Sequence, residues 1–483
     1  MPKTSLRNSL LAAGIFAVGI AGSLSPSFSM SMREAVGIAV DSNPEIGEAI
    51  SNREAIEFEL RQGRGLWMPR VDLEASIGGE IRNNRTTRAA ETLGSKYDTD
   101  HLFLRRQASV VVRQLLFDGF GADAEIERQA SRVDGASYRV LERSEFVALQ
   151  VIREYLDILR LRKVLGFTRK NISYHQGVLK KIGQGTSGGS ISVADRQQAE
   201  ERLYSARASL EEAKEEFKAA HSRFIKLVGR ESGKMSRPPS IHRAVPKSLD
   251  SAIGQARINH PSVKLATADI DAATALVKAA ESRYYPRVLL EGRGRLGRDL
   301  DGTRGMDNDA QANVVVEWNL FNGGIDKANR EEQVRRVDER RMTLHRVARE
   351  IEEGVRLSWD RKTIQRRRLA ALRQQAAKTE QLITSYTEQF KIGQRSLLDV
   401  LDTQNSRLFS SIAVVTAETA VDFAEYRLLA STGSLLKTMS IKPPSAAWAY
   451  AREDAKVPPT PAAETMTRNS PIRPVMPTAG SLY

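Results

Sequence analysis

Leu320-Phe321-Asn322-Gly323 repeats an earlier stretch of the chain, Leu116-Phe117-Asp118-Gly119. Self-similarity of this kind indicates an internally duplicated architecture. The 483-residue chain is therefore expected to hold two copies of one unit, residues 30–230 and 249–437, joined by a linker at 231–248. Three further motif pairs occur in the same order: Pro44 with Pro261, Pro69-Arg70-Val71 with Pro286-Arg287-Val288, and Lys181-Ile182-Gly183-Gln184 with Lys391-Ile392-Gly393-Gln394.

The N-terminus has the features of an export signal. Lys3 and Arg7 precede an apolar run from Leu10 to Ala21, so residues 1–29 are predicted to be a secretory signal peptide. No later stretch offers the roughly 18 consecutive apolar residues of a membrane-spanning helix. The absence of cysteine excludes a disulfide scaffold and a lipid-bearing N-terminal cysteine. The expected locations are the periplasm, the outer membrane or the medium.

Proline is absent over two long intervals, from Pro69 to Pro238 and from Pro286 to Pro443. Because proline breaks helix interiors, these intervals permit very long helices. Helical-period patterns predict rods of about 90–100 Å, each followed by a short joint and a second helix. The two expected helical hairpins cover residues 122–228 and 325–437, with a Lys-Ile-Gly-Gln motif at each tip.

In four stretches upstream of these helices, apolar and polar residues alternate with a period of two. Val110 and Val112, for example, alternate with Ser109 and Arg113. Alternation over about ten residues is typical of a transmembrane β-strand with one lipid face and one wet face, and also of a soluble antiparallel sheet. The expected strands are residues 71–82 and 104–117 in the first repeat and 287–298 and 310–321 in the second.

Aromatic residues gather where these strands meet the helices. In a membrane barrel they would form an interfacial girdle, whereas in a soluble sheet they would be ordinary core packing at its edge. The residues are Trp67, Phe117 and Phe120 in the first half, and Tyr284, Tyr285, Trp318 and Phe321 in the second.

Four strands cannot close a barrel by themselves. Lipid does not tolerate an open sheet edge, so several chains would have to share one barrel if these strands lie in a membrane. Two chains would reach the smallest membrane barrels of about eight strands, and three would give about twelve, with room for a channel.

The run from Ser385 to Asp402 resembles the second periplasmic tip of the TolC-type outer-membrane efflux proteins, and Tyr426 to Gly433 is also similar to that family. The likeness covers about residues 32–437. It implies an α+β membrane protein: a homotrimer with four strands per chain in a 12-stranded outer-membrane β-barrel, continued by a long α-helical periplasmic tunnel. It further implies a passive exit duct for toxic or hydrophobic compounds, for type I protein secretion, or for both. Its partners would be a periplasmic adaptor and an inner-membrane RND pump or ABC exporter.

Asp399 and Asp402 lie one helical turn apart, so they share a face of the predicted helix. In a threefold assembly their carboxylates would surround a narrow opening, where mutual repulsion would raise some pKa values and attract cations. The resemblance implies that they form the constriction at the periplasmic entrance. In a competing interpretation Ser396 and Asp399 form only a capping box, as Ser192 and Asp195 would at the first tip.

The resemblance also implies a gate at the tips. Arg395 matches a basic gate residue of the family, and Asp195 matches the acidic position with which that residue can pair. An ion pair between them would hold the tips closed. Phe390 departs from relatives that carry a tyrosine there, so it removes one hydroxyl from the expected closing network.

Other functions fit the sequence less well. The net charge of +14 is typical of nucleic-acid binding, but the export signal and the lack of interleaved aromatics disfavour it. The arginine-rich stretch at 335–368 is interpreted as a solvated helix face, or as a site for anionic lipid or cell-wall polymer. No metal-spaced histidine pair, nucleophile elbow or Walker loop is present, so no enzyme, cofactor or metal is expected. A periplasmic coiled-coil adaptor or scaffold is the alternative to a duct. The cargo stays open, and the proline-rich tail at 438–483 is expected to be disordered.

Overall fold

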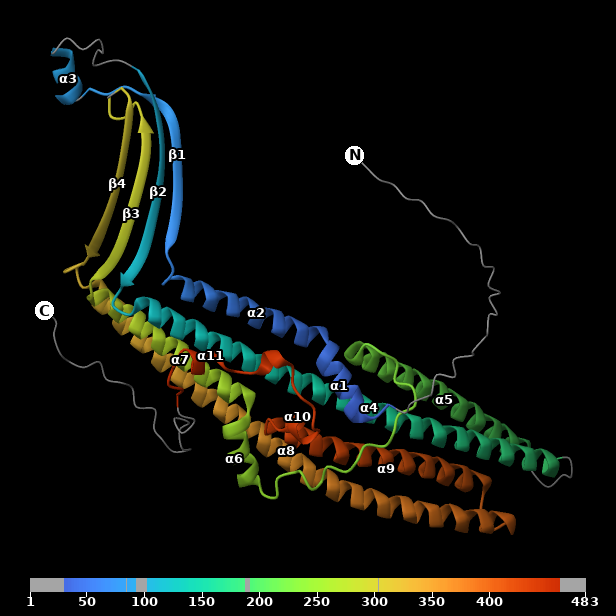
Figure 1. Cartoon of the computed structure of the whole chain (residues 1–483). Coiled ribbons are helices and arrows are strands. Elements are labelled where there is room, and N and C mark those ends of the chain that lie inside the picture. The colour runs from blue at the N-terminus through green and yellow to red at the C-terminus, as the bar shows by residue number, and fades with distance from the viewer. Residues whose placement is uncertain (1–29, 84, 93–101, 187–191, 303, 461–483) are drawn as a thin grey trace, which may run out of the picture.

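The computed structural model describes residues 30–83, 85–92, 102–186, 192–302 and 304–460. A curved sheet stands at one end of the molecule, and long helices run away from it toward two tips at the other end (Figure 1). The predicted signal peptide at 1–29 lies outside the described residues. Within those residues, no helix combines the length and the apolar character needed to cross a membrane.

The sheet has four antiparallel strands in the order β1-β2-β3-β4. Each repeat contributes one hairpin, and the two repeats meet between β2 and β3, where Val111 lies opposite Arg293. A short helix, α3 Arg85–Thr92, follows β1. The strands are β1 Arg70–Glu80, β2 Phe103–Phe117, β3 Arg287–Arg298 and β4 Met306–Glu317.

Strand β4 is shifted from its predicted range. It begins at Met306 and not at Ala310, and it ends at Glu317 and not at Phe321. The apolar side of the alternation continues past Glu317 at Trp318 and Leu320, whereas Asn308 interrupts it before Ala310, so the period alone does not locate the ends. The ladder with β3 does, because Met306 lies opposite Arg298 and Glu317 lies opposite Arg287, the last and first residues of that strand.

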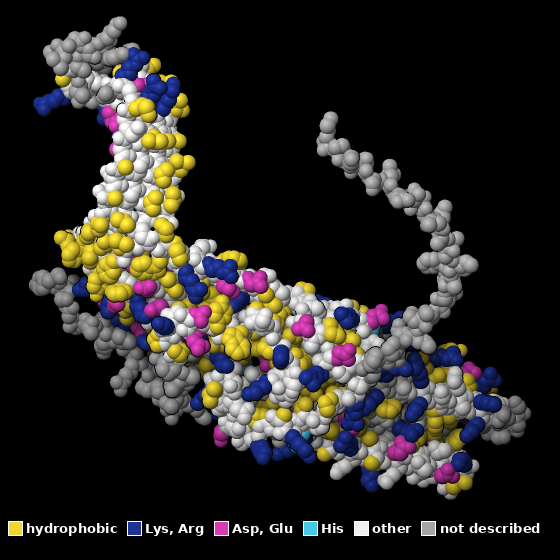
Figure 2. Space-filling view, viewed as in Figure 1, with side chains coloured by type: hydrophobic (Ala, Val, Ile, Leu, Met, Phe, Trp, Pro, Cys, Tyr) yellow, Lys and Arg dark blue, Asp and Glu magenta, His cyan; other side chains and the backbone are white. Residues whose placement is uncertain are grey.

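The two faces of the sheet differ in polarity. On β1, Val71, Leu73 and Ile77 are 64%, 75% and 72% exposed, and they lie on the same face as Val314 and Val316 of β4. Figure 2 shows hydrophobic side chains along this part of the molecule. Exposed apolar side chains in this number cannot be stabilised by water, so this face requires an apolar environment.

The opposite face carries a ladder of ion pairs across the strands. Arg113 of β2 lies 3.5 Å from Asp72 of β1 and 3.1 Å from Glu291 of β3. Arg295 of β3 pairs with Asp309 of β4. Cross-strand pairs of opposite charge stabilise a sheet, and here they also make this face the polar one.

Each repeat opens with two short helices joined at an X-Pro step. Asn43 precedes Pro44 and His260 precedes Pro261, and both prolines lie in the first turn of the next helix. The residue before a proline favours an extended conformation, whereas proline suits the first helical position, so each step ends one helix and begins another. The helices are α1 Met32–Ser42 and α2 Pro44–Gly65, then α6 Leu249–Asn259 and α7 Pro261–Glu281, which η1 Ser282–Tyr284 follows.

The long helices form one hairpin in each repeat. In the first hairpin, α4 Gly121–Thr186 pairs with α5 Val193–Val228. In the second, α8 Ile325–Lys391 pairs with α9 Leu397–Ser431. The two longer helices have 66 and 67 residues, which corresponds to rods of about 100 Å. Helix α9 ends earlier than the predicted residue 437, because Gly433 adopts a left-handed backbone with a φ of 67°.

The repeated Leu-Phe-(Asp/Asn)-Gly motif forms the turn between a strand and a long helix. The Asp118 carboxylate accepts the N–H groups of Gly121 at 2.9 Å and Ala122 at 2.7 Å, which caps the start of α4. Gly119 has a φ of 68°, and a Cβ there would lie 2.6 Å from the carbonyl oxygen of Ser282. Only glycine fits this turn, because the second repeat passes directly against it.

The largest hydrophobic core lies midway along the helices, where α1 and the ends of α5 and α9 pack on α4. At its centre the fully buried Tyr155 places its hydroxyl 2.8 Å from the carbonyl oxygen of Met30 and 2.7 Å from that of Ser236. The hydroxyl therefore ties the first described residue to the linker between the repeats.

Residues 438–460 fold against the helices, so the expectation of a disordered tail is wrong for this stretch. This stretch packs on α4 because it supplies apolar side chains as well as prolines: Ala451 is fully buried against Leu60, Ala130 and Val133. Residues 461–483 lie outside the described part of the chain. The elements here are α10 Leu435–Thr438, η2 Ser445–Ala447 and α11 Ala451–Asp454.

Candidate functional site

The tips of the two hairpins pack against each other within one chain. Ile182 of α4 and Ala199 of α5 form a buried cluster with Leu397 and Leu401 of α9. Phe390 is half-buried against this cluster, so its ring contributes apolar packing at the position where a tyrosine hydroxyl would be expected. The end of the molecule farthest from the sheet is thus held together by a small hydrophobic core.

An ion pair joins the two hairpins beside this core. Arg202 of α5 donates from Nη2 to Oδ1 of Asp402 on α9, at 2.9 Å. Two residues further from the tip on α9, Gln404 donates to the side-chain oxygen of Asn171 on α4, also at 2.9 Å, and both residues are buried. An exposed ion pair contributes about 0.2–1 kcal/mol and a buried hydrogen bond about 0.5–1.5 kcal/mol. These two polar contacts between the hairpins are therefore specific but weak.

Arg395 makes all of its observed contacts within its own hairpin. Its guanidinium lies over the Tyr386 ring, 4.1 Å from the centroid. Nε donates to Oε1 of Gln389 at 3.2 Å, and Nη1 lies 3.7 Å from Oδ2 of Asp399. Arg395 thus stabilises the turn between α8 and α9.

Asp195 closes a capping box at the start of α5. Its carboxylate accepts the N–H of Ser192 at 3.3 Å and the hydroxyl of Ser192 at 2.7 Å, and its own N–H donates to that hydroxyl at 3.1 Å. Within one chain, the predicted ion pair between Arg395 and Asp195 is therefore not formed. Each of the two residues has a nearer partner on its own hairpin.

The side chains of Asp399 and Asp402 on α9 are 42% and 55% exposed. Ser396 accepts the backbone N–H of Asp399 at 3.2 Å, so the predicted cap is present. The Asp399 carboxylate does not complete the capping box but turns to Arg395, whereas at the first tip the box is complete. The capping interpretation therefore accounts for Ser396 but not for the carboxylates of Asp399 and Asp402.

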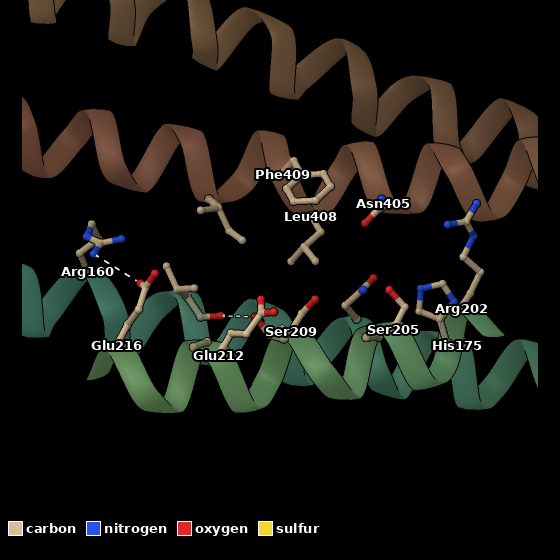
Figure 3. Close-up of a pocket in the computed structure, with 16 residues that line it drawn as sticks. Arg160, His175, Arg202, Ser205, Ser209, Glu212, Glu216, Asn405, Leu408 and Phe409 are labelled. Atoms are coloured by element: carbon tan, nitrogen blue, oxygen red, sulfur yellow. Dashed lines mark hydrogen bonds and ion pairs between the residues drawn. The ribbon is translucent and has the colours of Figure 1, made fainter. Parts of the chain in front are cut away.

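A groove of about 320 Å³ runs between the two hairpins behind the tips. Figure 3 shows Ser205 and Glu212 of α5 on one side of it and Asn405 and Phe409 of α9 on the other. His175 of α4 lines its end near the tip and is only 3% exposed. Burial lowers the pKa of the His175 imidazole, and the positive charge of Arg202 lowers it further.

Sequence reasoning missed the partner of Asp402 and the groove. The spacing of the histidines excluded a metal site but did not predict a buried one beside the tips, and the predicted acidic gate residue, Asp195, lies on α5. Arg202 could have been found, because it follows Asp195 by two helical turns and so lies on the same side of α5. Among the described residues, no group of three or more His, Asp or Glu side chains could hold a metal ion.

The predicted aromatic residues lie around the base of the sheet, where Figure 2 shows hydrophobic side chains collected. Phe120, Trp318 and Phe321 are strongly exposed. Trp318 donates from its ring N–H to the carbonyl oxygen of Tyr284 at 3.2 Å. Packing inside a core does not account for these exposed rings. Trp67 and Phe117 are half-buried. The Trp67 ring N–H donates to Asp123 at 3.3 Å, and the Phe117 ring lies edge-on to that of Phe120.

A family model described as "Outer membrane efflux protein" matches residues 35–230 and 252–434, which are the two repeats. The chain belongs to the outer membrane efflux protein family. The predicted resemblance to the TolC-type proteins is confirmed. The outer membrane efflux protein BepC of Brucella suis biovar 1 (strain 1330) is 26% identical over 327 residues, which are 68% of this chain and 72% of that protein.

Solved structures of outer membrane channels and of a further membrane protein share the fold. A membrane protein from Pseudomonas aeruginosa has a TM-score of 0.71 at 18% identity, over 83% of this chain and 90% of that one. The CmeC outer membrane channel of Campylobacter jejuni has a TM-score of 0.70 at 14% identity, over 88% of this chain and 89% of that one. This outer membrane efflux protein is located in the outer membrane, and its helical tunnel lies in the periplasm.

Proposed function

We propose that three copies of the chain form one outer-membrane channel, the exit duct of a tripartite export system. The observation that supports this most is the sheet itself. Within the described residues, β1 and β4 each pair with only one strand, and the apolar face between them is exposed. An unpaired backbone group in lipid costs several kcal/mol, so both edges need partners. The β4 edge of one copy fits the β1 edge of the next, and twelve strands leave a channel.

The lateral edges of the helical part agree with this arrangement. Helices α2 and α5 lie on the β1 side of the chain, and α8 lies on the β4 side (Figure 1). Copies joined along the sheet would therefore also meet along their helices. The ladder of charged residues around Arg113 and Arg295 would then face the water-filled interior, and Val314 and Val316 would face lipid.

We further propose that the tips form the gate of this duct. Three copies would bring together the exposed carboxylates of Asp399 and Asp402, which together would attract cations and narrow the periplasmic entrance. An ion pair between Arg395 of one copy and Asp195 of a neighbour would hold neighbouring tips together. Trp318, Phe321 and the other aromatic residues at the base of the sheet would form the periplasmic interfacial girdle.

The duct is passive in this proposal, so the energy for transport comes from partners. These are a periplasmic adaptor and an inner-membrane pump or ABC exporter that meet the tips. For the cargo, we infer toxic or hydrophobic small compounds, because the relative BepC is named an efflux protein. Type I protein secretion would use the same duct.

A deletion strain separates these cargoes. Its sensitivity to detergents and dyes is measured beside its secreted proteins, with a plasmid-borne wild-type copy as the control. Efflux predicts sensitivity that the plasmid restores, with an unchanged set of secreted proteins. The loss of a secreted protein without sensitivity would assign the duct to secretion, and a strain that is normal in both would contradict the proposal.

A further inference from the structure

The ordered segment after α9 runs back along the helices toward the sheet. From α10 it passes over α4 and α2 through η2, and α11 then lies on α4 (Figure 1). The segment therefore contacts the first repeat although it follows the second in sequence. Its start is fixed inside the molecule, because Glu145 of α4 accepts the N–H of Leu436 at 3.2 Å.

A buried arginine near the end of this segment contacts both repeats. Arg452 donates from Nε to Oδ2 of Asp134 on α4 at 2.9 Å, and from Nη1 to Oδ2 of Asp271 on α7 at 2.5 Å. Arg452 is 8% exposed, and both aspartates are more deeply buried. The backbone N–H groups of Ala451 and Thr460 also donate to these carboxylates, at 2.8 and 3.0 Å. One side chain thus joins a helix of the first repeat to a helix of the second.

The charges of this triad depend on one another. Burial alone would lower the pKa of Arg452, but its hydrogen bonds to Asp134 and Asp271 raise it above the ordinary value. Removing one member would leave the remaining charges buried without a counter-charge. This destabilises a protein more than replacing the whole buried ion pair does. The triad therefore fixes one arrangement of the segment against α4 and α7.

We propose that residues 438–460 are a strap that pins the two repeats together next to the sheet, with Arg452 as its lock. Asp134 follows the start of α4 at Gly121, and Asp271 precedes the end of α7 at Glu281, so the lock lies about 15–20 Å from the sheet. The tip of α4 lies about 80 Å from Asp134. The strap holds the sheet ends of the repeats in register and leaves the tips free to separate. Because it acts within one chain, this inference does not depend on the trimer.

Limited trypsin digestion of the full-length protein in detergent tests the strap. Lys456 is exposed, yet cleavage after it requires the strap to detach locally. R452M should raise the rate of cleavage at Lys456 about tenfold or more, with unchanged helical content by circular dichroism. K442M removes another positive charge from the same segment at an exposed position, and in this variant trypsin should cleave at Lys456 at the wild-type rate.

A second set of variants separates the lock from general damage. R452K keeps the charge but loses the forked geometry, so an intermediate rate is expected. The triple variant R452M/D134N/D271N leaves no uncompensated charge and should be cleaved more slowly than R452M alone. Equal rates for R452M and K442M would overturn the proposal, as would a triple variant cleaved as fast as R452M.

Discussion

Arg202 of α5 and Asp402 of α9 form a 2.9 Å ion pair that joins the two helical hairpins of one chain close to their tips. The pair lies next to the buried cluster around Leu401 and within two helical turns of the hydrogen bond between Gln404 and Asn171. Any opening that separates the two hairpins of a chain has to break it. Asp402 is therefore both an exposed carboxylate near the tip and half of a contact that resists opening.

Exchanging the two charges should show whether this pair holds the tips closed. R202D and D402R alone should each increase the leak through the resting channel in planar bilayers. The increase should be up to about fivefold for each Arg202–Asp402 ion pair that is lost, because an exposed ion pair contributes about 0.2–1 kcal/mol. The double variant R202D/D402R should return the leak toward the wild-type level. R196A breaks an ion pair within α5 alone and serves as the control. A double variant that leaks as much as the single ones would refute the pairing.

Asp399 tests the entrance ring more cleanly than Asp402, because its carboxylate has no contact with the other hairpin. D399N should weaken the block of the channel by divalent cations, since half of the ring carboxylates are neutralised. The measurement is conductance at increasing Mg²⁺ concentration. E388Q, which removes an exposed charge on α8, is the matched control. Block that is equal in D399N and wild type would remove Asp399 from the ring.

Neighbouring valines on β4 distinguish a lipid face from a wet face. Val314 lies on the apolar face of the sheet and Val315 on the polar one. An arginine facing the middle of the bilayer costs about 2–4 kcal/mol, so V314R should lower the yield of assembled protein in outer-membrane fractions. V315R should assemble normally. Equal assembly of the two variants would contradict the assignment of the faces.

Glu145 should make stability depend on pH. Burial raises the pKa of its carboxyl to about 7 from an ordinary 4.5, against the opposing effect of the Leu436 and Leu435 N–H groups. The folded state therefore keeps a proton that the unfolded chain releases, so the free energy of unfolding should fall as the pH rises from about 4.5 to about 7. The loss is on the order of 3 kcal/mol.

Melting curves of the purified protein between pH 5 and pH 8 check this expectation. E145Q should flatten the pH dependence, whereas E48Q, at an exposed position of α2, should leave it unchanged. A wild-type melting temperature that does not fall over this range would show that Glu145 is ionised in the folded protein throughout.

Local patterns in the sequence were sufficient for the repeated elements. Pro44 and Pro261 act on their own neighbours, and the alternation around Val110 reflects one strand and its two faces, so these features follow from short stretches of chain. The limits of β4 did not follow, because they depend on the length of β3 opposite it. The folded segment that follows the second repeat was also not predicted from the sequence.

Contacts between residues far apart in the chain could not be predicted from the sequence. Arg395 and Asp195 each found a partner within their own hairpin, whereas Asp402 paired with Arg202, 200 positions away in the chain. Arg452 lies in a proline-rich stretch whose composition is typical of disorder, and its partners are 318 and 181 positions distant. Composition describes the average of a segment, whereas this segment folds through particular contacts: Ala451 packs on α4, and Arg452 meets two buried carboxylates.

The mass of the intact assembly tests the central claim most directly. The β1 and β4 edges of one 53.6 kDa chain have no partners in the described sheet, and a shared barrel requires that they pair with further copies. Native mass spectrometry of the protein released from detergent micelles should therefore show a single species containing three chains. A species with one or two chains that still conducts ions in a planar bilayer would contradict the shared barrel.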